Sequence, residues 1–104
     1  MGEKKTFAKQ TVLEGKKVGL KPPPLYMVLM HNDDYTTMDF VVDVLQRVFS
    51  KPLPEANRIM LNIHNQGIGF CGTYTFEVAE TKVGQVHSMA KEAGFPLHCS
   101  LKET

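Results

Sequence analysis

Long apolar runs, tryptophan and closely spaced cysteines are all missing from this 104-residue sequence. Without a stretch of 18 apolar residues it predicts no transmembrane helix. Without an apolar segment in its first twenty residues it predicts no secretory signal. The two cysteines, Cys71 and Cys99, lie far apart in apolar runs and show no C-x-x-C spacing. We therefore expect a cytoplasmic protein whose cysteines are reduced thiols, packed as small core residues.

A strong net charge is missing as well, because the chain carries only +1 at pH 7. Residues 1–21 hold six lysines and two glutamates, whereas residues 22–104 hold six basic and nine acidic side chains. A mildly acidic domain offers no basic face, so we expect no nucleic-acid partner and no membrane partner. Residues 1–21 also lack a helix or strand period. They predict a flexible, disordered N-terminal tail, joined through the stiff Pro22–Pro24 segment to one folded domain at 22–104.

Apolar spacing divides the folded domain into six elements in the order βααβαβ. The strands are expected at residues 25–31, 68–74 and 97–101, and the helices at residues 36–51, 54–66 and 75–93. This order predicts the α+β class: a compact domain with a three-stranded antiparallel sheet and three helices packed on one face. Thr36-x-x-Asp39 has the form of a capping box at the start of the first helix, and Gly67 suits a left-handed cap at the end of the second.

The segment Asn32-Asp33-Asp34 places more polar acceptors between strand and helix than a turn requires. Asn and Asp favour turns and helix N-termini, so turn chemistry is the plainest interpretation. A metal site is a weaker one, because His31, Asn32, Asp33 and His64 show no ligand spacing, and we expect no cofactor. An acid/base pair is also weak. Consecutive carboxylates point to different sides, and no nucleophile with a partner base is recognisable, so we expect no enzyme.

A receptor for a cation is the remaining interpretation. A primary ammonium has three N–H donors and needs three acceptors. Asn32, Asp33 and a neutral His64 would supply them if the second helix ends beside this turn. Apolar residues that could line an adjoining pocket are Met30, Met38, Val41, Met60 and Ile63. Methionine suits an adaptable pocket, although at this helical spacing the same residues also suit an ordinary core.

Several segments resemble one known family. They are H-N-D-D-Y-T-T-M-D-F-V-V-D-V-L, I-M-L-N-I-H-N-Q-G, C-G-T-Y-T-F-E-V-A-E-T-K-V and P-L-H-C-S-L, spread in order over about residues 22–101. Together they resemble ClpS, the bacterial adaptor that delivers N-degron substrates to the ClpAP protease. The resemblance implies a βααβαβ adaptor domain without catalytic activity.

The resemblance also implies roles for individual residues. The substrate's α-amino group would be held by Asn32, Asp33 and His64, and its first side chain (Leu, Phe, Tyr or Trp) would enter a pocket in which Met38 acts as a gate against β-branched residues. The pocket residues implied are Met30, Asp34, Thr36, Met38, Val41, Met60, Ile63 and Leu97. The surface for the amino-terminal domain of the ClpA unfoldase would include Tyr35 and the segment from Glu77 to Lys82.

Two differences from the family pattern leave open how the pocket ranks Leu, Phe, Tyr and Trp as first residues. Ile63 stands where Val is more usual, and Ile68-Gly69 replaces a more polar pair after Gly67. The extra methylene of Ile63 is expected to narrow the pocket. Two other hypotheses use the same residues: an interaction domain with a fold like that of the ribosomal stalk protein's carboxyl domain and no amine pocket, or a small hydrolase.

Overall fold

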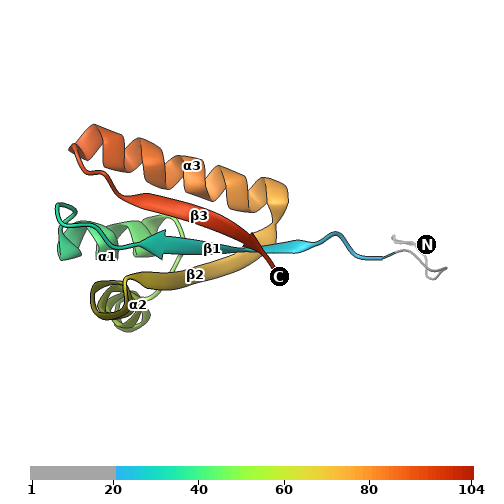
Figure 1. The fold of residues 1–104 in the computed structure, drawn as a ribbon, viewed down its shortest axis with the longest axis horizontal. Coiled ribbons are helices and arrows are strands. Elements are labelled where there is room, and N and C mark those ends of the chain that lie inside the picture. Colours follow the sequence, from blue (N-terminus) through green and yellow to red (C-terminus); the bar gives the residue numbers. More distant parts are fainter. Residues whose placement is uncertain (1–20) are drawn as a thin grey trace, which may run out of the picture.

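The computed structural model describes residues 21–104 and contains three strands and three helices in the order βααβαβ (Figure 1). The elements are β1 (Leu25–His31), α1 (Met38–Arg47), α2 (Leu53–Gln66), β2 (Ile68–Thr75), α3 (Phe76–Ala93) and β3 (His98–Glu103). The predicted element order is therefore confirmed. The prediction of a flexible N-terminal tail falls on residues 1–20, outside the described residues.

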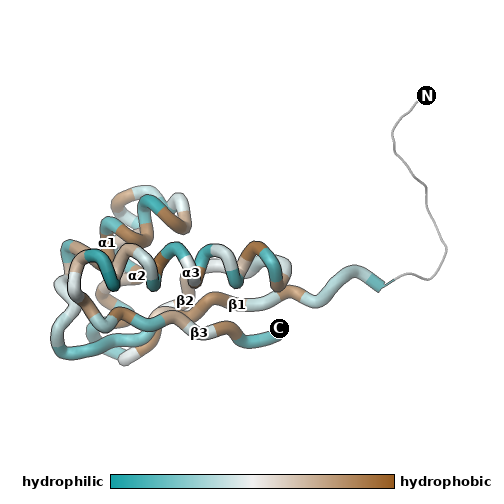
Figure 2. Tube along the Cα trace, turned by 90° about the horizontal axis from the view of Figure 1, so that it is seen from above, coloured by the Kyte–Doolittle hydropathy of each residue, from teal (hydrophilic) through white to brown (hydrophobic). Residues whose placement is uncertain are grey.

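The strands form an antiparallel sheet in the order β2-β1-β3, so the first strand is central. His31 pairs with both Ile68 and His98 at one end of β1, and Leu25 pairs with Thr75 at the other. Figure 2 shows all three helices on one side of the sheet, as the apolar spacing predicted. The register of β1 against β2 shifts between Val28 and Leu29, as a β-bulge does.

The core lies between the sheet and the helices. From β1 it receives Val28 and Met30, which are completely buried, because alternate residues of a strand point to the same face. Cys71 and Cys99 are free thiols in this core, as predicted. Burial raises the pKa of Cys99 to about 12 and that of Cys71 further still, so neither thiol ionises at neutral pH.

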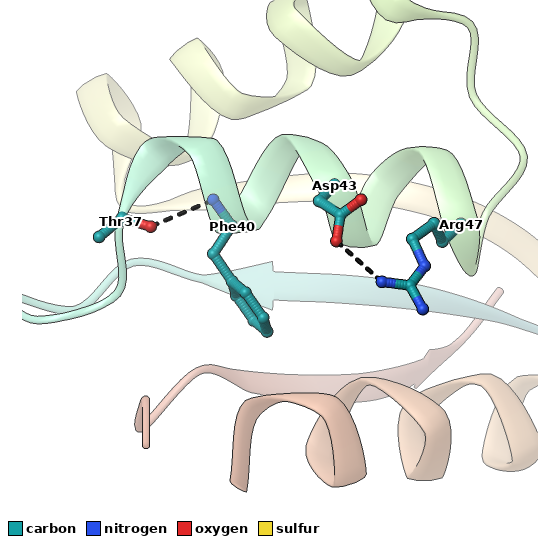
Figure 3. Close-up of polar contacts among 4 residues, drawn as sticks. All are labelled: Thr37, Phe40, Asp43 and Arg47. Atoms are coloured by element: carbon teal, nitrogen blue, oxygen red, sulfur yellow. Dashed lines mark hydrogen bonds and ion pairs between the residues drawn. The ribbon is translucent and has the colours of Figure 1, made fainter. Parts of the chain in front are cut away.

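The start of α1 differs from the prediction. Thr37, not Thr36, is the N-cap, and its hydroxyl accepts a hydrogen bond of 3.1 Å from the backbone N–H of Phe40 (Figure 3). One turn later Arg47 donates to Asp43 over 3.1 Å, an ion pair between residues four positions apart. A capping box from Thr36 to Asp39 was wrong because the hydroxyl of Thr36 is used elsewhere, in the turn before the helix.

Candidate functional site

A cavity of about 260 Å³ lies at the end of the sheet where β1 gives way to the turn before α1. Its walls come from three places: the turn, the first half of α1 and the last two turns of α2. The residues that line it are Asn32, Asp33, Asp34, Thr36, Met38, Val41, Met60, Ile63 and His64. Nine of the eleven residues implied for substrate binding are thus brought together around one hollow.

One backbone hydrogen bond explains how distant residues meet. The N–H of Asn32 donates to the carbonyl of Gly67 over 2.9 Å. Gly67 is the C-cap of α2, with φ of 88°, a left-handed conformation that glycine adopts without steric cost. Since His64 lies in the last turn of α2, this bond fixes the Asn32 turn beside the imidazole. The cap was predictable from Gly67, but its bond to Asn32 was not.

The carboxylate of Asp33 holds the turn together. One oxygen accepts from the backbone N–H of Tyr35 (2.8 Å) and of Thr36 (2.7 Å), and the other accepts from the Thr36 hydroxyl (2.6 Å). Partial burial raises the pKa of Asp33, but the bonds from Thr36 and Tyr35 outweigh it and keep this pKa below its ordinary value. Turn chemistry and a role at the cavity are therefore combined in one residue. A carboxylate has about four acceptor positions, so one is left for a ligand.

The side chains of Asn32 and His64, the other two acceptors at the cavity, do not stabilise the turn. Within residues 21–104, neither the Asn32 amide nor the His64 imidazole has a side-chain hydrogen-bond partner, and both residues are exposed. Both also lie near the C-terminal end of α2, where the partial negative charge of the helix favours a cation. Three acceptors around the mouth of a hollow suit a small cationic group that carries several N–H donors.

The inner wall of the cavity is apolar. Val41 and Ile63 are 6% and 2% exposed, Met60 is half-buried, and Met38 is 43% exposed. An apolar group that enters the hollow would therefore leave water. Two residues implied for the pocket, Met30 and Leu97, do not line it. Both belong to the core, where they are 0% and 4% exposed.

The residues implied for partner docking do not gather on one surface. Tyr35 is 76% exposed and follows the His31 end of β1, whereas Glu77 lies in the first turn of α3, beside the opposite end of the sheet (Figure 1). Glu77 and Lys82 line a shallow hollow of about 240 Å³. The Lys82 ammonium is anchored, because it donates to the Val48 carbonyl over 2.9 Å and lies 5.2 Å above the Tyr74 ring.

A histidine cluster at the edge of the sheet was not anticipated. His31, His98 and His87 follow one another with ring centroids 5.3 and 5.5 Å apart. His87 accepts a 3.1 Å hydrogen bond from the backbone N–H of Cys99, and His31 is 2.7 Å from the Ser100 hydroxyl. Burial and the neighbouring His98 lower the pKa of His87. Only the pairing of β1 with β3 reveals this cluster, since its members are up to 67 positions apart in the sequence.

Among residues 21–104, no three side chains of His, Cys, Asp or Glu are grouped so that they could hold a metal ion. No helix of that range is long and apolar enough to cross a membrane.

Comparison with known proteins identifies close relatives. Residues 21–100 match the family model for the ATP-dependent Clp protease adaptor protein ClpS. The adapter protein ClpS of Desulfatibacillum aliphaticivorans is 66% identical over 80 residues, 77% of each chain, and that of Desulforapulum autotrophicum is 60% identical over 81 residues, 78% of each chain. Among solved structures, Agrobacterium tumefaciens ClpS2 bound to L-phenylalaninamide is similar with a TM-score of 0.77 at 36% identity, covering 80% of this chain and 100% of that one.

Proposed function

Because this chain belongs to the ClpS family of ATP-dependent Clp protease adaptors, we propose that it captures proteins by a free N-terminal amino group and a bulky first side chain, Leu, Phe, Tyr or Trp. It then delivers them to the ClpA unfoldase of the ClpAP protease. The observation that carries the proposal is the meeting of Asn32, Asp33 and His64 at the mouth of a cavity with an apolar wall. The similar Agrobacterium protein was solved with L-phenylalaninamide, which combines a free α-amino group with an aromatic side chain.

The amino group is recognised by charge and donor number. An α-amino group has a pKa near ~8, so most N-termini are cationic at pH 7. Its three N–H donors match the Asn32 carbonyl oxygen, the remaining acceptor position of Asp33 and a nitrogen of neutral His64. An acetylated terminus or an internal residue has no charge and keeps only one of the three N–H donors. Its binding would cover these acceptors without pairing all of them, which costs about 1–3 kcal/mol for each acceptor that is removed from water unpaired.

The first side chain is recognised by burial. Its transfer into the cavity contributes roughly 1.5–3 kcal/mol for a residue such as Leu or Phe. Met38 stands half-exposed over the hollow and is flexible, so it can adapt to side chains of different shape. We assign Met38 the role of a gate that excludes β-branched first residues, because a branch at Cβ would contact the Met38 side chain at the entrance of the cavity.

The decisive experiment compares two peptides of identical sequence that begin with Phe, one with a free amino group and one N-acetylated. Fluorescence anisotropy should give at least about a hundredfold weaker binding for the acetylated peptide, because the charge and two of the three N–H donors are lost together. A third peptide that begins with Val tests the gate. Equal affinity for the free and acetylated peptides would overturn the proposed function.

Delivery requires a second surface, for which we propose the start of α3. Glu77 and Val78 are exposed there, and the anchored Lys82 presents a fixed positive charge. Glu77→Lys should weaken binding of the amino-terminal domain of ClpA by at least about fivefold. Glu103→Lys makes the same charge change in β3 and serves as the matched control. If both variants bind as the parent does, the surface lies elsewhere, and Tyr35→Ala then tests the opposite end of the sheet.

The segment 1–21 is proposed to be engaged by the unfoldase during hand-over. A chain that lacks residues 1–20 should bind the Phe peptide as the parent does but fail to support degradation of a Phe-initiated protein by reconstituted ClpAP. Undiminished degradation would remove this role.

A further inference from the structure

Two glycines flank the end of α2 and the start of β2 for different reasons. Gly67 needs its left-handed φ of 88°, and a Cβ there would meet nothing within 4 Å. Gly69 does not have a positive φ, so its backbone suits any residue. A Cβ on Gly69, however, would lie 2.5 Å from Cγ1 of Ile63 and 3.1 Å from its Cδ1. Gly69 is therefore required for space and not for backbone conformation.

Ile63 is the side chain that uses this space. It is 2% exposed, and it has Gly69 of β2 on one side and the cavity on the other. Its Cγ1 and Cδ1 both point at Gly69, and Cδ1 is the atom that valine lacks. The Ile59 side chain also reaches toward this glycine, with Cγ2 3.3 Å from the same Cβ position. The last turns of α2 therefore pack onto β2 more closely than any residue with a Cβ at position 69 would allow.

We propose that Gly69 is a positioning residue that sets how wide a first side chain the cavity accepts, by holding Ile63 back against β2. This inference rests on the proposed function. It also accounts for the two family departures together: the extra methylene of Ile63 is accommodated above Gly69 and does not narrow the cavity.

The variant Gly69→Ala should displace Ile63. Its χ1 angle is restricted because a β-branched residue in a helix has one preferred rotamer, so the last turn of α2 must move as well. Close-packed interiors leave little other room, and the adjoining empty space is the cavity. The cavity wall then moves inward, and the loss of peptide affinity increases with the size of the peptide's first side chain.

The measurement is fluorescence anisotropy with free-amine peptides that begin with Leu, Phe or Trp and are otherwise identical. Gly69→Ala should lose roughly tenfold more affinity for the Trp and Phe peptides than for the Leu peptide, as expected for overpacking. In the Ile63→Ala background the same change should have no size-dependent effect, because the clashing atoms are gone. Gly84→Ala, in α3 with nothing within 4 Å of its Cβ position, is the control and should bind as the parent does.

A milder variant decides the matter even if Gly69→Ala does not fold. Ile63→Val removes Cδ1, the atom that points at Gly69 and not into the cavity under this proposal. The affinity ratios among the Leu, Phe and Trp peptides should therefore change by less than about twofold. A gain of about fivefold or more for Trp over Leu would show that Cδ1 fills the cavity and would overturn the inference. So would an equal loss for all three peptides in Gly69→Ala. Failure of the proposed function looks different, since the parent would then bind none of them.

Discussion

Two histidine-bearing regions of this molecule use the same residue type in opposite ways. At the edge of β3, His87 accepts from the backbone N–H of Cys99 and stacks on His98. At the end of α2, His64 is exposed and its imidazole has no hydrogen-bond partner within residues 21–104. The difference shows that the candidate site is marked by acceptors that the fold leaves unused, and not by the presence of histidine.

The physical reason is that the two regions differ in which backbone hydrogen-bonding groups still need a partner. β3 is an edge strand, so the Cys99 N–H that points away from β1 needs a partner, and the imidazole of His87 supplies it. The end of α2 already satisfies its cap through the Gly67 N–H, which donates to the Ile63 carbonyl over 2.9 Å. His64 therefore has no structural duty, and its side chain remains available for a ligand.

The largest expected effect separates charge from turn formation at Asp33. Asp33→Ala should weaken binding of a Phe-initiated peptide by at least about a hundredfold, because it removes both the proposed partner of the ammonium and the bonds that shape the turn. Asp33→Asn keeps most of the turn but not the charge and should lose less. Asp39→Asn, an exposed carboxylate of α1, is the control. If the Asp39 variant loses as much affinity as the Asp33 variants, the effect is one of overall charge.

The second prediction compares alanine variants of the two histidines, His64 and His87. His64→Ala should lower peptide affinity about tenfold or more while the unfolding temperature stays unchanged, because the exposed side chain proposed to accept from the ammonium is removed. His87→Ala should leave affinity within about twofold but destabilise the fold by about 1 kcal/mol, since the Cys99 N–H loses its acceptor. Anisotropy and thermal unfolding measure the two properties. The comparison fails if the His87 variant loses binding and the His64 variant loses stability.

The third prediction contrasts two neighbouring threonines. Thr37→Ala removes the cap of α1 and should cost about 1 kcal/mol of unfolding free energy with little change in affinity. Thr36→Ala removes the hydroxyl that orients the Asp33 carboxylate and should weaken peptide binding by a few-fold. Denaturant unfolding and anisotropy on both variants check this. Equal effects of the two variants on affinity would show that Thr36 does not act through Asp33.

The smallest expected effect is a pH dependence from the edge of β3. The pKa of His87 is lowered in the fold from its ordinary value of 6.5, so the unfolded chain binds more protons between the two values. Stability should therefore be fully present above about pH 6.5 and fall as the pH drops below it, by less than about 1 kcal/mol because the partly exposed ring is screened by solvent. In His87→Gln, which can still accept from Cys99, this slope should shrink. If the dependence of stability on pH is unchanged in this variant, another titratable group causes it.

Periodicity sufficed to predict most of the fold. The apolar run of β1, the three- and four-residue spacing of the helices, and Gly67 as the end of α2 are local signals, and local signals can be read without knowing the partner elements. The error at the start of α1 has the same origin. The capping-box spacing favours Thr36 over its neighbour Thr37, but the competing bond from Thr36 to Asp33 leaves Thr37 to cap the helix.

The sequence by itself determined the element order, the buried thiols and, through its motifs, the family. It also supplied the residue types that a cation site requires. The tertiary structure alone decided which acceptors meet, because the bond from Asn32 to Gly67 joins segments 35 positions apart. It likewise decided that Met30 and Leu97 belong to the core and that Gly69 makes room for Ile63. These outcomes depend on distances between elements, and a pattern along one chain segment carries no information about such distances.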